Sequence, residues 1–189
     1  MIEIRADDVT PTPWRNGGGQ TRELLAWPAG PDWTIRVSVA DIERDGPFSA
    51  FPGVERWFAI LEGRGVLLGL TEGTRRVVVG DPPVRFNGAP PPTCALIEGP
   101  VRDFNLMVRG GTGVMRAIHS EATRDERVRC PGLFTVRAGV WSCGTGFRRE
   151  VPANTLLFDL PDAPGRFVSS DTGPLGWWFG AVPTPNSSR

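Results

Sequence analysis

Residues 14–23 combine side chains that can bind a small anion with a backbone that a ligand can approach closely. They read Trp-Arg-Asn-Gly-Gly-Gly-Gln-Thr-Arg-Glu, so an indole, a guanidinium, a carboxamide and a carboxylate surround three consecutive glycines. Glycine adopts positive φ readily and leaves room for a second backbone or a ligand. Two interpretations follow from this segment alone: a loop that presents Trp14, Arg15 and Asn16 to a ligand, or a tight turn that joins two early strands.

Polar and apolar side chains alternate along three later segments that have the texture of β-strands. Because successive side chains of a strand point to opposite faces, each segment has one hydrogen-bonding face. Four side chains suited to binding or proton transfer lie on these faces: Glu23, Arg36, Asp103 and Asn105. Two alternatives are open, namely a solvated outer face, which the pattern alone favours, and the lining of a small barrel that holds one ligand.

A loop bounded by Pro and Gly, residues 45–53, carries two aromatic side chains just before another strand. Exposure of Phe48 and Phe51 to water is unfavourable, so we expect them to cap a cavity or to pack on that strand. The strand opens with Glu55 and Arg56. Structural charge pairing and contact with a ligand are both open for these two residues.

The composition excludes several kinds of catalytic site. All 21 residues counted as Lys or Arg are Arg, which excludes a Schiff-base lysine, a pyridoxal-phosphate site and a Walker lysine. An anion site here therefore has to use arginine. His119 is the single histidine, so one chain cannot build a metal site from two or three histidines. We expect neither a metal nor another cofactor.

Charge and cysteine usage narrow the choice of partner and compartment. A formal net charge of +0 gives no reason to expect nucleic acid or an anionic membrane as a partner. No apolar run is long enough to span a bilayer. The three cysteines are widely spaced and form no Cys-x-x-Cys motif, which is typical of a reducing compartment, so we expect a cytoplasmic protein.

Short apolar or alternating runs recur along the chain and predict the strands of an all-β fold. Two examples are the runs at 66–70 and 134–141. The runs are separated by many of the 24 Gly and 19 Pro, which leave little room for long helices. We expect few short helices, and only residues 120–129 have a helical composition. The segment 110–113 and the polar stretch 120–129 divide the chain and predict a first β unit at 1–110 and a second at 111–189, packed as one globule.

Four motifs together resemble the HutD/Ves family. They lie at residues 14–23, 45–53, 61–65 and 99–107, in the order that the family has, and they cover about the first 110 residues. The resemblance implies a cupin-type (RmlC-like) β-barrel in a bicupin-like arrangement of two fused halves. A metal-binding cupin would carry His-x-His where this chain has Phe48, Ser49 and Phe51, which argues against a metal-dependent dioxygenase.

The resemblance also implies a function. HutD-like proteins are associated with bacterial histidine utilisation and Ves-like proteins with a stress response, and no enzymatic activity is firmly attached to the family. The expectation is a non-enzymatic accessory or regulatory protein that binds a small carboxylate-bearing metabolite such as N-formylglutamate or urocanate. The expected ligand contacts are Trp14, Arg15, Asn16, Glu23, Arg36, Phe51, Arg56, Asp103 and Asn105.

Other functions stay open at this point. One is a metal-independent isomerase or lyase that uses Glu23 or Asp103 as general base. Another is docking on a protein partner through the aromatic run Trp177-Trp178-Phe179, although the pattern favours core packing for that run. A Ves-type stress role is a third alternative. The sequence leaves the oligomeric state open, with a homodimer as one alternative.

Overall fold

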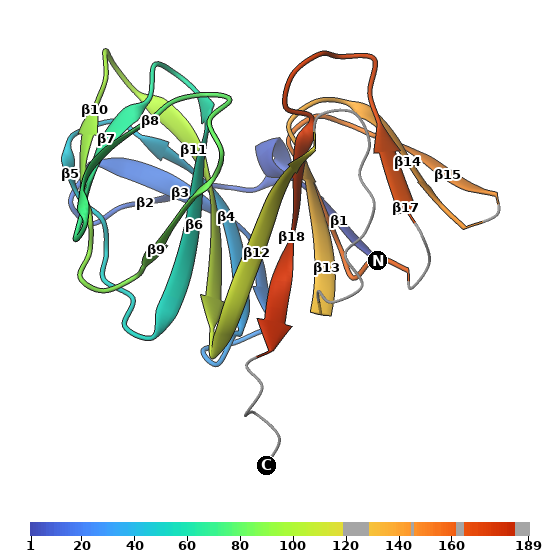
Figure 1. Cartoon of the computed structure of the whole chain (residues 1–189), viewed down its shortest axis with the longest axis horizontal. Coiled ribbons are helices and arrows are strands. Elements are labelled where there is room, and N and C mark those ends of the chain that lie inside the picture. Colours follow the sequence, from blue (N-terminus) through green and yellow to red (C-terminus); the bar gives the residue numbers. More distant parts are fainter. Residues whose placement is uncertain (119–128, 145, 162–164, 184–189) are drawn as a thin grey trace. The chain divides into compact units, whose positions relative to one another are not determined.

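A computed structural model describes residues 1–118, 129–144, 146–161 and 165–183, and these residues form an all-β fold (Figure 1). The one helical element among them is a 3-10 turn, η1 (Ala6–Asp8). The prediction of an all-β protein is confirmed. The helix expected at 120–129 lies outside the described residues except for Arg129, which begins a strand. The chain divides into two compact units, Thr10–Gly113 and Met1–Val9 together with Val114–Arg189.

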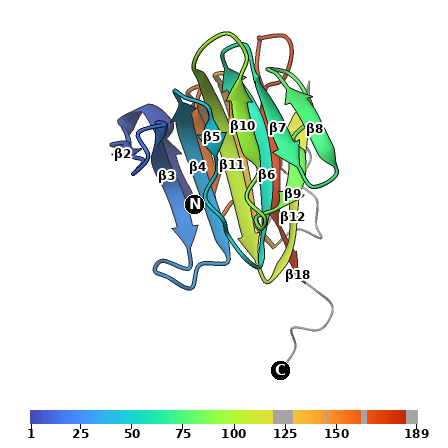
Figure 2. The ribbon, with the colours of Figure 1, turned by 90° about the vertical axis from the view of Figure 1, so that its left-hand side faces the viewer.

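The unit Thr10–Gly113 contains two antiparallel sheets. The six-stranded sheet has, in spatial order, β2 (Thr12–Pro13), β3 (Gly19–Trp27), β4 (Ile35–Ile42), β11 (Val101–Arg109), β6 (Val54–Glu62) and β9 (Val84–Asn87). The four-stranded sheet has β5 (Gly46–Pro47), β10 (Thr93–Leu96), β7 (Val66–Leu70) and β8 (Gly73–Val77). Figure 2 shows this smaller sheet in front of the larger one.

Apolar side chains from both sheets of this unit form one core at one end of the space between them. Phe58 and Ile60 of β6 pack in it with Leu68 of β7 and Cys94 of β10. Both faces of the central strands are buried, as the exposures of Val37 (0%) and its neighbour Ser38 (4%) show. A polar side chain that is buried on these strands therefore needs a partner inside the protein or in a cavity.

The other unit also has two antiparallel sheets. Its larger sheet has β1 (Ile2–Arg5), β16 (Thr155–Phe158), β13 (Arg129–Thr135), β18 (Gly176–Pro183) and β12 (Gly111–Ile118). Its smaller sheet has β15 (Phe147–Val151), β14 (Gly139–Cys143) and β17 (Gly165–Val168). Trp177 and Phe179 are buried and Trp178 packs on the core of this unit, so the interpretation of this aromatic run as core is confirmed.

The first residues of the chain belong to this second unit, whereas the sequence-based division assigned residues 1–110 to the first. The backbone of β1 pairs with β16 along its whole length, from Ile2 opposite Phe158 to Arg5 opposite Thr155. The amide of Ala6 then donates to the carbonyl of Asn154 at 2.8 Å. A pairing between segments so distant in sequence leaves no local pattern to detect.

Candidate functional site

The six-stranded sheet brings one polar side chain each from β3, β4 and β11 into one row on its inner face. Strand register places Glu23 opposite Ser38, and Ser38 opposite Asn105. A register shift between Glu23 and Leu25 adds one residue to β3, and both Leu24 and Leu25 are buried beside it. Such a bulge re-aims one side chain without ending the strand.

Two arginines face each other across the next row of the same sheet. Arg36 of β4 lies opposite Met107 of β11, and Met107 lies opposite Arg56 of β6. Neighbouring strands are about 4.8 Å apart, so the two arginine backbones are separated by roughly 10 Å. The row therefore carries two guanidinium groups with a thioether between them.

A tight hairpin between β2 and β3 closes one side of the site. The amide of Trp14 donates to the carbonyl of Gly19 at 2.8 Å, and the amide of Gly17 donates to the carbonyl of Trp14 at 3.0 Å. Gly17 has φ +66, and a Cβ added at Gly19 would overlap the carbonyl oxygen of Asp41. The tight-turn interpretation of the glycine run is thus confirmed, and the same turn places Trp14, Arg15 and Asn16 in the lining of the cavity. Their contact with a ligand stays a prediction.

Side chains of this hairpin are fixed by local hydrogen bonds. The indole Nε1 of Trp14 donates to Oγ1 of Thr21 at 2.7 Å. The side-chain Oδ1 of Asn16 accepts from the amide of Gly18 at 3.0 Å, which is an Asx-type turn. The hairpin therefore has a defined shape before any ligand binds.

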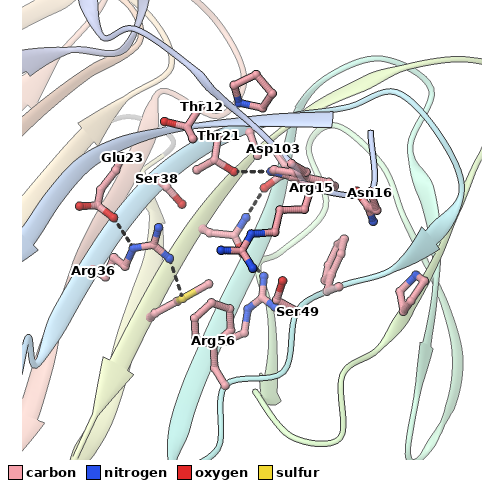
Figure 3. A pocket seen from close by; sticks show the side chains of 18 residues that line it. Thr12, Arg15, Asn16, Thr21, Glu23, Arg36, Ser38, Ser49, Arg56 and Asp103 are labelled. Atoms are coloured by element: carbon pink, nitrogen blue, oxygen red, sulfur yellow. Dashed lines mark hydrogen bonds and ion pairs between the residues drawn. The ribbon is translucent and has the colours of Figure 1, made fainter. Parts of the chain in front are cut away.

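A cavity of about 890 Å³ lies against the inner face of the sheet, bounded by this hairpin and by the 45–53 loop (Figure 3). All nine residues predicted as ligand contacts line it: Trp14, Arg15, Asn16, Glu23, Arg36, Phe51, Arg56, Asp103 and Asn105. The structure thus brings the predicted set together, and its role in binding stays a prediction. Of the two alternatives for the polar strand faces, the cavity lining applies to Asp103 and Asn105, which are 0% and 5% exposed, whereas the side chain of Glu23 lines the cavity and is still exposed to solvent.

Arg56 is the most buried cation of the cavity and sits among aromatic rings. Its side chain is 4% exposed. Its Cζ lies 5.0 Å from the ring centroid of Phe48, 5.2 Å from that of Phe86 and 5.7 Å from that of Phe51. These rings attract the guanidinium through their π faces but offer it no hydrogen-bond acceptor.

The hydrogen-bonding capacity of Arg56 is only partly used. Its Nη2 donates to Oδ1 of Asn105 at 2.8 Å, whereas its buried Nε and Nη1 have no acceptor among the described residues. Burial lowers the pKa of Arg56 to about 10, with the charge of Arg36 adding to this and that of Asp103 opposing it. The guanidinium is therefore still charged at neutral pH, with two buried donors unsatisfied.

Asp103 is a fully buried carboxyl beside this arginine. Its Oδ1 accepts from Nδ2 of Asn105, and its Oδ2 has no partner among the described residues. Burial raises the pKa of Asp103 well above its usual range, and the charge of Asp41 adds to this while that of Arg56 opposes it. The neutral form of Asp103 is therefore favoured far more than in an exposed aspartate.

The other two arginines of the cavity differ in how they are paired. Arg36 donates from Nε to Oε2 of Glu23 at 2.6 Å and contacts the sulfur of Met107 at 3.9 Å. The side chain of Arg15 forms no hydrogen bond or ion pair with the described part of the chain. In Figure 3 it extends from the hairpin over the cavity.

Glu55 and Arg56 do not pair with each other, although they are adjacent in sequence. Glu55 accepts from Nε1 of Trp57 at 3.0 Å and from the amide of Gly113 at 2.7 Å, and it forms an ion pair with Arg85. Glu55 therefore pairs with other groups of the protein, whereas Arg56 points into the cavity.

Met107 and Phe48 line the cavity but were absent from the predicted ligand contacts. A signal for Met107 exists in the sequence, because it continues the two-residue alternation of Asp103 and Asn105. Phe48 was expected only to cap a cavity or to pack on a strand, and it forms a tilted ring pair with Phe58 at 5.7 Å.

The cavity does not fit a divalent metal ion. No group of three or more His, Cys, Asp or Glu side chains is placed to hold a metal within the described residues. The cavity lining carries three arginines, whose charge repels a cation, against the two carboxyls of Glu23 and Asp103. Separately, no helix in the described part of the chain is long and apolar enough to cross a membrane.

Comparison with known proteins identifies the family. The HutD family profile matches residues 6–147, which is more than half of the chain. The chain belongs to the HutD family. The motifs at 14–23, 45–53, 61–65 and 99–107, on which the sequence-based resemblance rested, all lie inside the matched region, and that prediction is confirmed.

Two relatives are similar in sequence to this HutD-family chain. An uncharacterized 21.2 kDa protein from the hutC 3′ region of Pseudomonas putida is 37% identical over 108 residues, which are 55% of this chain and 56% of that protein. Protein Ves of Escherichia fergusonii is 33% identical over 133 residues, which are 69% of this chain and 70% of Ves. The chain thus spans just over half the length of the first relative and about two thirds of the second.

Solved structures agree with this assignment. HutD from Pseudomonas fluorescens SBW25, determined in a formate condition, aligns with a TM-score of 0.80 at 26% identity, over 96% of this chain and 97% of that chain. A cupin barrel-domain protein from Leptotrichia buccalis aligns with a TM-score of 0.58 at 9% identity, over 95% and 96% of the two chains, which shows likeness of fold alone. The predicted cupin-like fold is confirmed, and the two all-β units fit the bicupin-like arrangement.

Proposed function

We propose that this HutD-family protein binds a small organic acid in the cavity beside Arg56 and acts as an accessory or regulatory protein rather than as an enzyme. The observation that carries the proposal is the pair of buried, unpartnered donors on Arg56, Nε and Nη1. Buried polar groups in folded proteins nearly always have a hydrogen-bond partner. A charged side chain that keeps two buried donors free, in the wall of a cavity, indicates a partner from outside the chain.

A carboxylate is the group that satisfies these donors best. Guanidinium donors bind carboxylate oxygens in pairs, and hydrogen bonds between charged groups are about twice as strong as neutral ones. Each unsatisfied buried donor destabilises the ligand-free protein by about 1–3 kcal/mol, and a bound carboxylate removes that penalty. The rings of Phe48 and Phe51 enclose the site on its apolar side, which strengthens the charge interaction by excluding water.

Asn105 and Asp103 support this assignment. Asn105 holds Nη2 of Arg56 at 2.8 Å and so fixes the plane of the guanidinium. Asp103, with its pKa raised by burial, can present Oδ2 as a donor to a second ligand oxygen. The three side chains together form a preorganised recognition site for one carboxylate, since each is already oriented by its neighbour.

The names of two relatives support a proposal for the biological role. The Pseudomonas putida relative is encoded in a hutC 3′ region, and the Pseudomonas fluorescens relative is named HutD. We therefore place this protein in histidine utilisation, with N-formylglutamate or urocanate as the candidate ligand. A stress role of the kind suggested for Ves relatives stays an alternative. The protein itself is proposed to act in the cytoplasm.

Isothermal titration calorimetry with N-formylglutamate and urocanate tests the binding function. The wild-type protein is compared with Arg56→Lys, which keeps the positive charge but lacks the planar fork. Arg64→Lys is the matched control, because Arg64 is 74% exposed in a surface pair with Glu98. We expect one acid to bind wild type and the control equally and to bind Arg56→Lys at least tenfold more weakly. Absence of binding by both acids at millimolar concentration contradicts the proposal.

A second candidate function has one observation in its favour. A buried carboxyl with a raised pKa in a cavity wall is a typical general acid, and Asp103 meets that description. Glu23, the other candidate base, is held by Arg36 at 2.6 Å on the more exposed side of the cavity. Turnover of N-formylglutamate or urocanate, followed by NMR and abolished by Asp103→Asn, would establish an isomerase or lyase instead of a binding protein.

A further inference from the structure

The charges that line the cavity do not balance within the protein. Five ionisable side chains line it among the described residues: Arg15, Glu23, Arg36, Arg56 and Asp103. Glu23 and Arg36 neutralise each other in an ion pair of 2.6 Å. Asp103 is fully buried and forms no ion pair within 4 Å among the described residues, and burial favours its neutral form. Two cations, Arg15 and Arg56, therefore lack an anionic partner.

The two cations differ in depth. Arg56 projects from the sheet and is almost completely buried, whereas Arg15 is exposed on the hairpin. Figure 3 shows the Arg15 side chain reaching from the hairpin over the cavity, on the side of the sheet where Arg56 lies. A ligand bound to Arg56 therefore has a second cation above it.

The hairpin that carries Arg15 is constrained on both sides of that residue. Trp14 is held through Nε1 on Thr21, and Asn16 accepts from the amide of Gly18. The carbonyl of Gly18 in turn accepts from the amides of Glu43 and Arg44, at 2.9 and 3.2 Å. The Cα of Arg15 is thus fixed relative to the sheet, and only its own side chain has to be ordered when a ligand binds.

Part of the cavity wall is apolar. Phe48, Phe51 and Met107 line this part of the cavity. Such a surface suits the methylene chain of a ligand and gives a second charge no partner except Arg15 or the paired Arg36.

We propose that the bound acid is a short dicarboxylate, with its inner carboxylate on Arg56 and its outer carboxylate on Arg15, so that Arg15 determines specificity for diacids over monoacids. This inference rests on the proposed function, because it assumes that the cavity binds an acid. It favours N-formylglutamate, which has two carboxylates, over urocanate, which has one.

The test compares each diacid with a neutralised form of itself. Calorimetric titrations use N-formylglutamate, succinate, glutarate and adipate, each beside its monomethyl ester, on wild type, Arg15→Gln and Arg64→Gln. Arg64→Gln is the matched control, since Arg64 is exposed and does not line the cavity. We expect wild type and the control to bind the preferred diacid about fivefold more tightly than its ester, which is the upper range for an exposed ion pair.

Arg15→Gln is expected to lose that preference by binding the diacid as weakly as the ester, without a change in affinity for the ester. The preference in wild type should also fall when NaCl is raised from 0.05 to 0.5 M, since screening weakens an exposed pair. An equal diacid preference in Arg15→Gln and wild type overturns the inference, as does equal affinity of wild type for diacid and ester. In both cases acid binding itself still stands. Failure of every acid and every ester to bind wild type overturns the proposed function as well.

Discussion

Replacement of Arg56 by methionine separates the role of this residue in binding from its role in folding. Methionine is apolar, flexible and close enough in length to keep contact with the surrounding rings. In the ligand-free protein the change removes two unsatisfied buried donors, which relieves about 2–6 kcal/mol. It also removes the hydrogen bond to Asn105, which is about 1.5–3 kcal/mol for a charged donor, and the contacts with three aromatic rings, about 0.5–1 kcal/mol each.

These opposing contributions nearly cancel. We therefore expect the free energy of unfolding of Arg56→Met to lie within about 2 kcal/mol of the wild-type value, although a buried charged residue has been removed. By contrast, breaking a fully paired buried ion pair costs about 3–5 kcal/mol. Binding should respond in the opposite way, because two charge-assisted hydrogen bonds to a carboxylate are lost. At about 1.5–3 kcal/mol each, their loss weakens affinity by roughly 10²- to 10⁴-fold.

The assay pairs urea denaturation, followed by tryptophan fluorescence, with calorimetric titration of the acid that binds wild type. Arg64→Met is the control for loss of an exposed arginine. A loss of more than about 4 kcal/mol of stability in Arg56→Met would show that the guanidinium is satisfied by the protein itself. Unchanged affinity in Arg56→Met would show that the acid binds elsewhere. Each result refutes the reasoning above.

Three further substitutions have expected outcomes. Burial raises the pKa of Asp103, so the folded protein disfavours ionisation of this carboxyl. The wild-type protein therefore loses stability as pH rises through the folded pKa. Asp103→Asn should gain stability over wild type at pH 8 and not at pH 3. Burial raises the pKa of Asp41, but hydrogen bonds from Arg102, Arg22 and Gln20 outweigh it and lower the net value. Asp41→Asn should therefore lose more stability at pH 7 than at pH 3. Denaturant midpoints across this pH range check both, and a shared pH trend would contradict the pair. A Cβ at Gly19 would overlap the carbonyl of Asp41, so Gly19→Ala should lower the melting temperature and displace the hairpin. Gly46→Ala is the matched control, because neither glycine has a left-handed φ and a Cβ at Gly46 meets open space.

Much of the fold was predictable from local patterns. The apolar run at Val66–Leu70 was expected as a strand and is β7 with those bounds. The run 134–141 was expected as one strand, but β13 ends at Thr135 and β14 starts at Gly139. The amides of Val136 and Arg137 donate to the carbonyl of Leu175 there, a contact across the fold that local sequence does not show.

The site was predictable in its members but not in its geometry. Alternation places Asp103 and Asn105 on one face of a strand, but whether that face is inside depends on the second sheet. The alternation along β6 does not show which face of the sheet Arg56 points to, because Phe58 and Ala59 are buried on opposite faces. The unpartnered donors of Arg56 and the pairing of Arg36 with Glu23 depend on distances between strands that only the folded chain defines.

A crystal structure of the protein with N-formylglutamate tests the central claim most directly, because it shows what Nε and Nη1 of Arg56 bind. We expect a ligand carboxylate within hydrogen-bond distance of both atoms, with Asp103 Oδ2 facing one of its oxygens. A structure in which these two donors are satisfied by the protein's own groups, with the acid bound outside the cavity, would contradict the account.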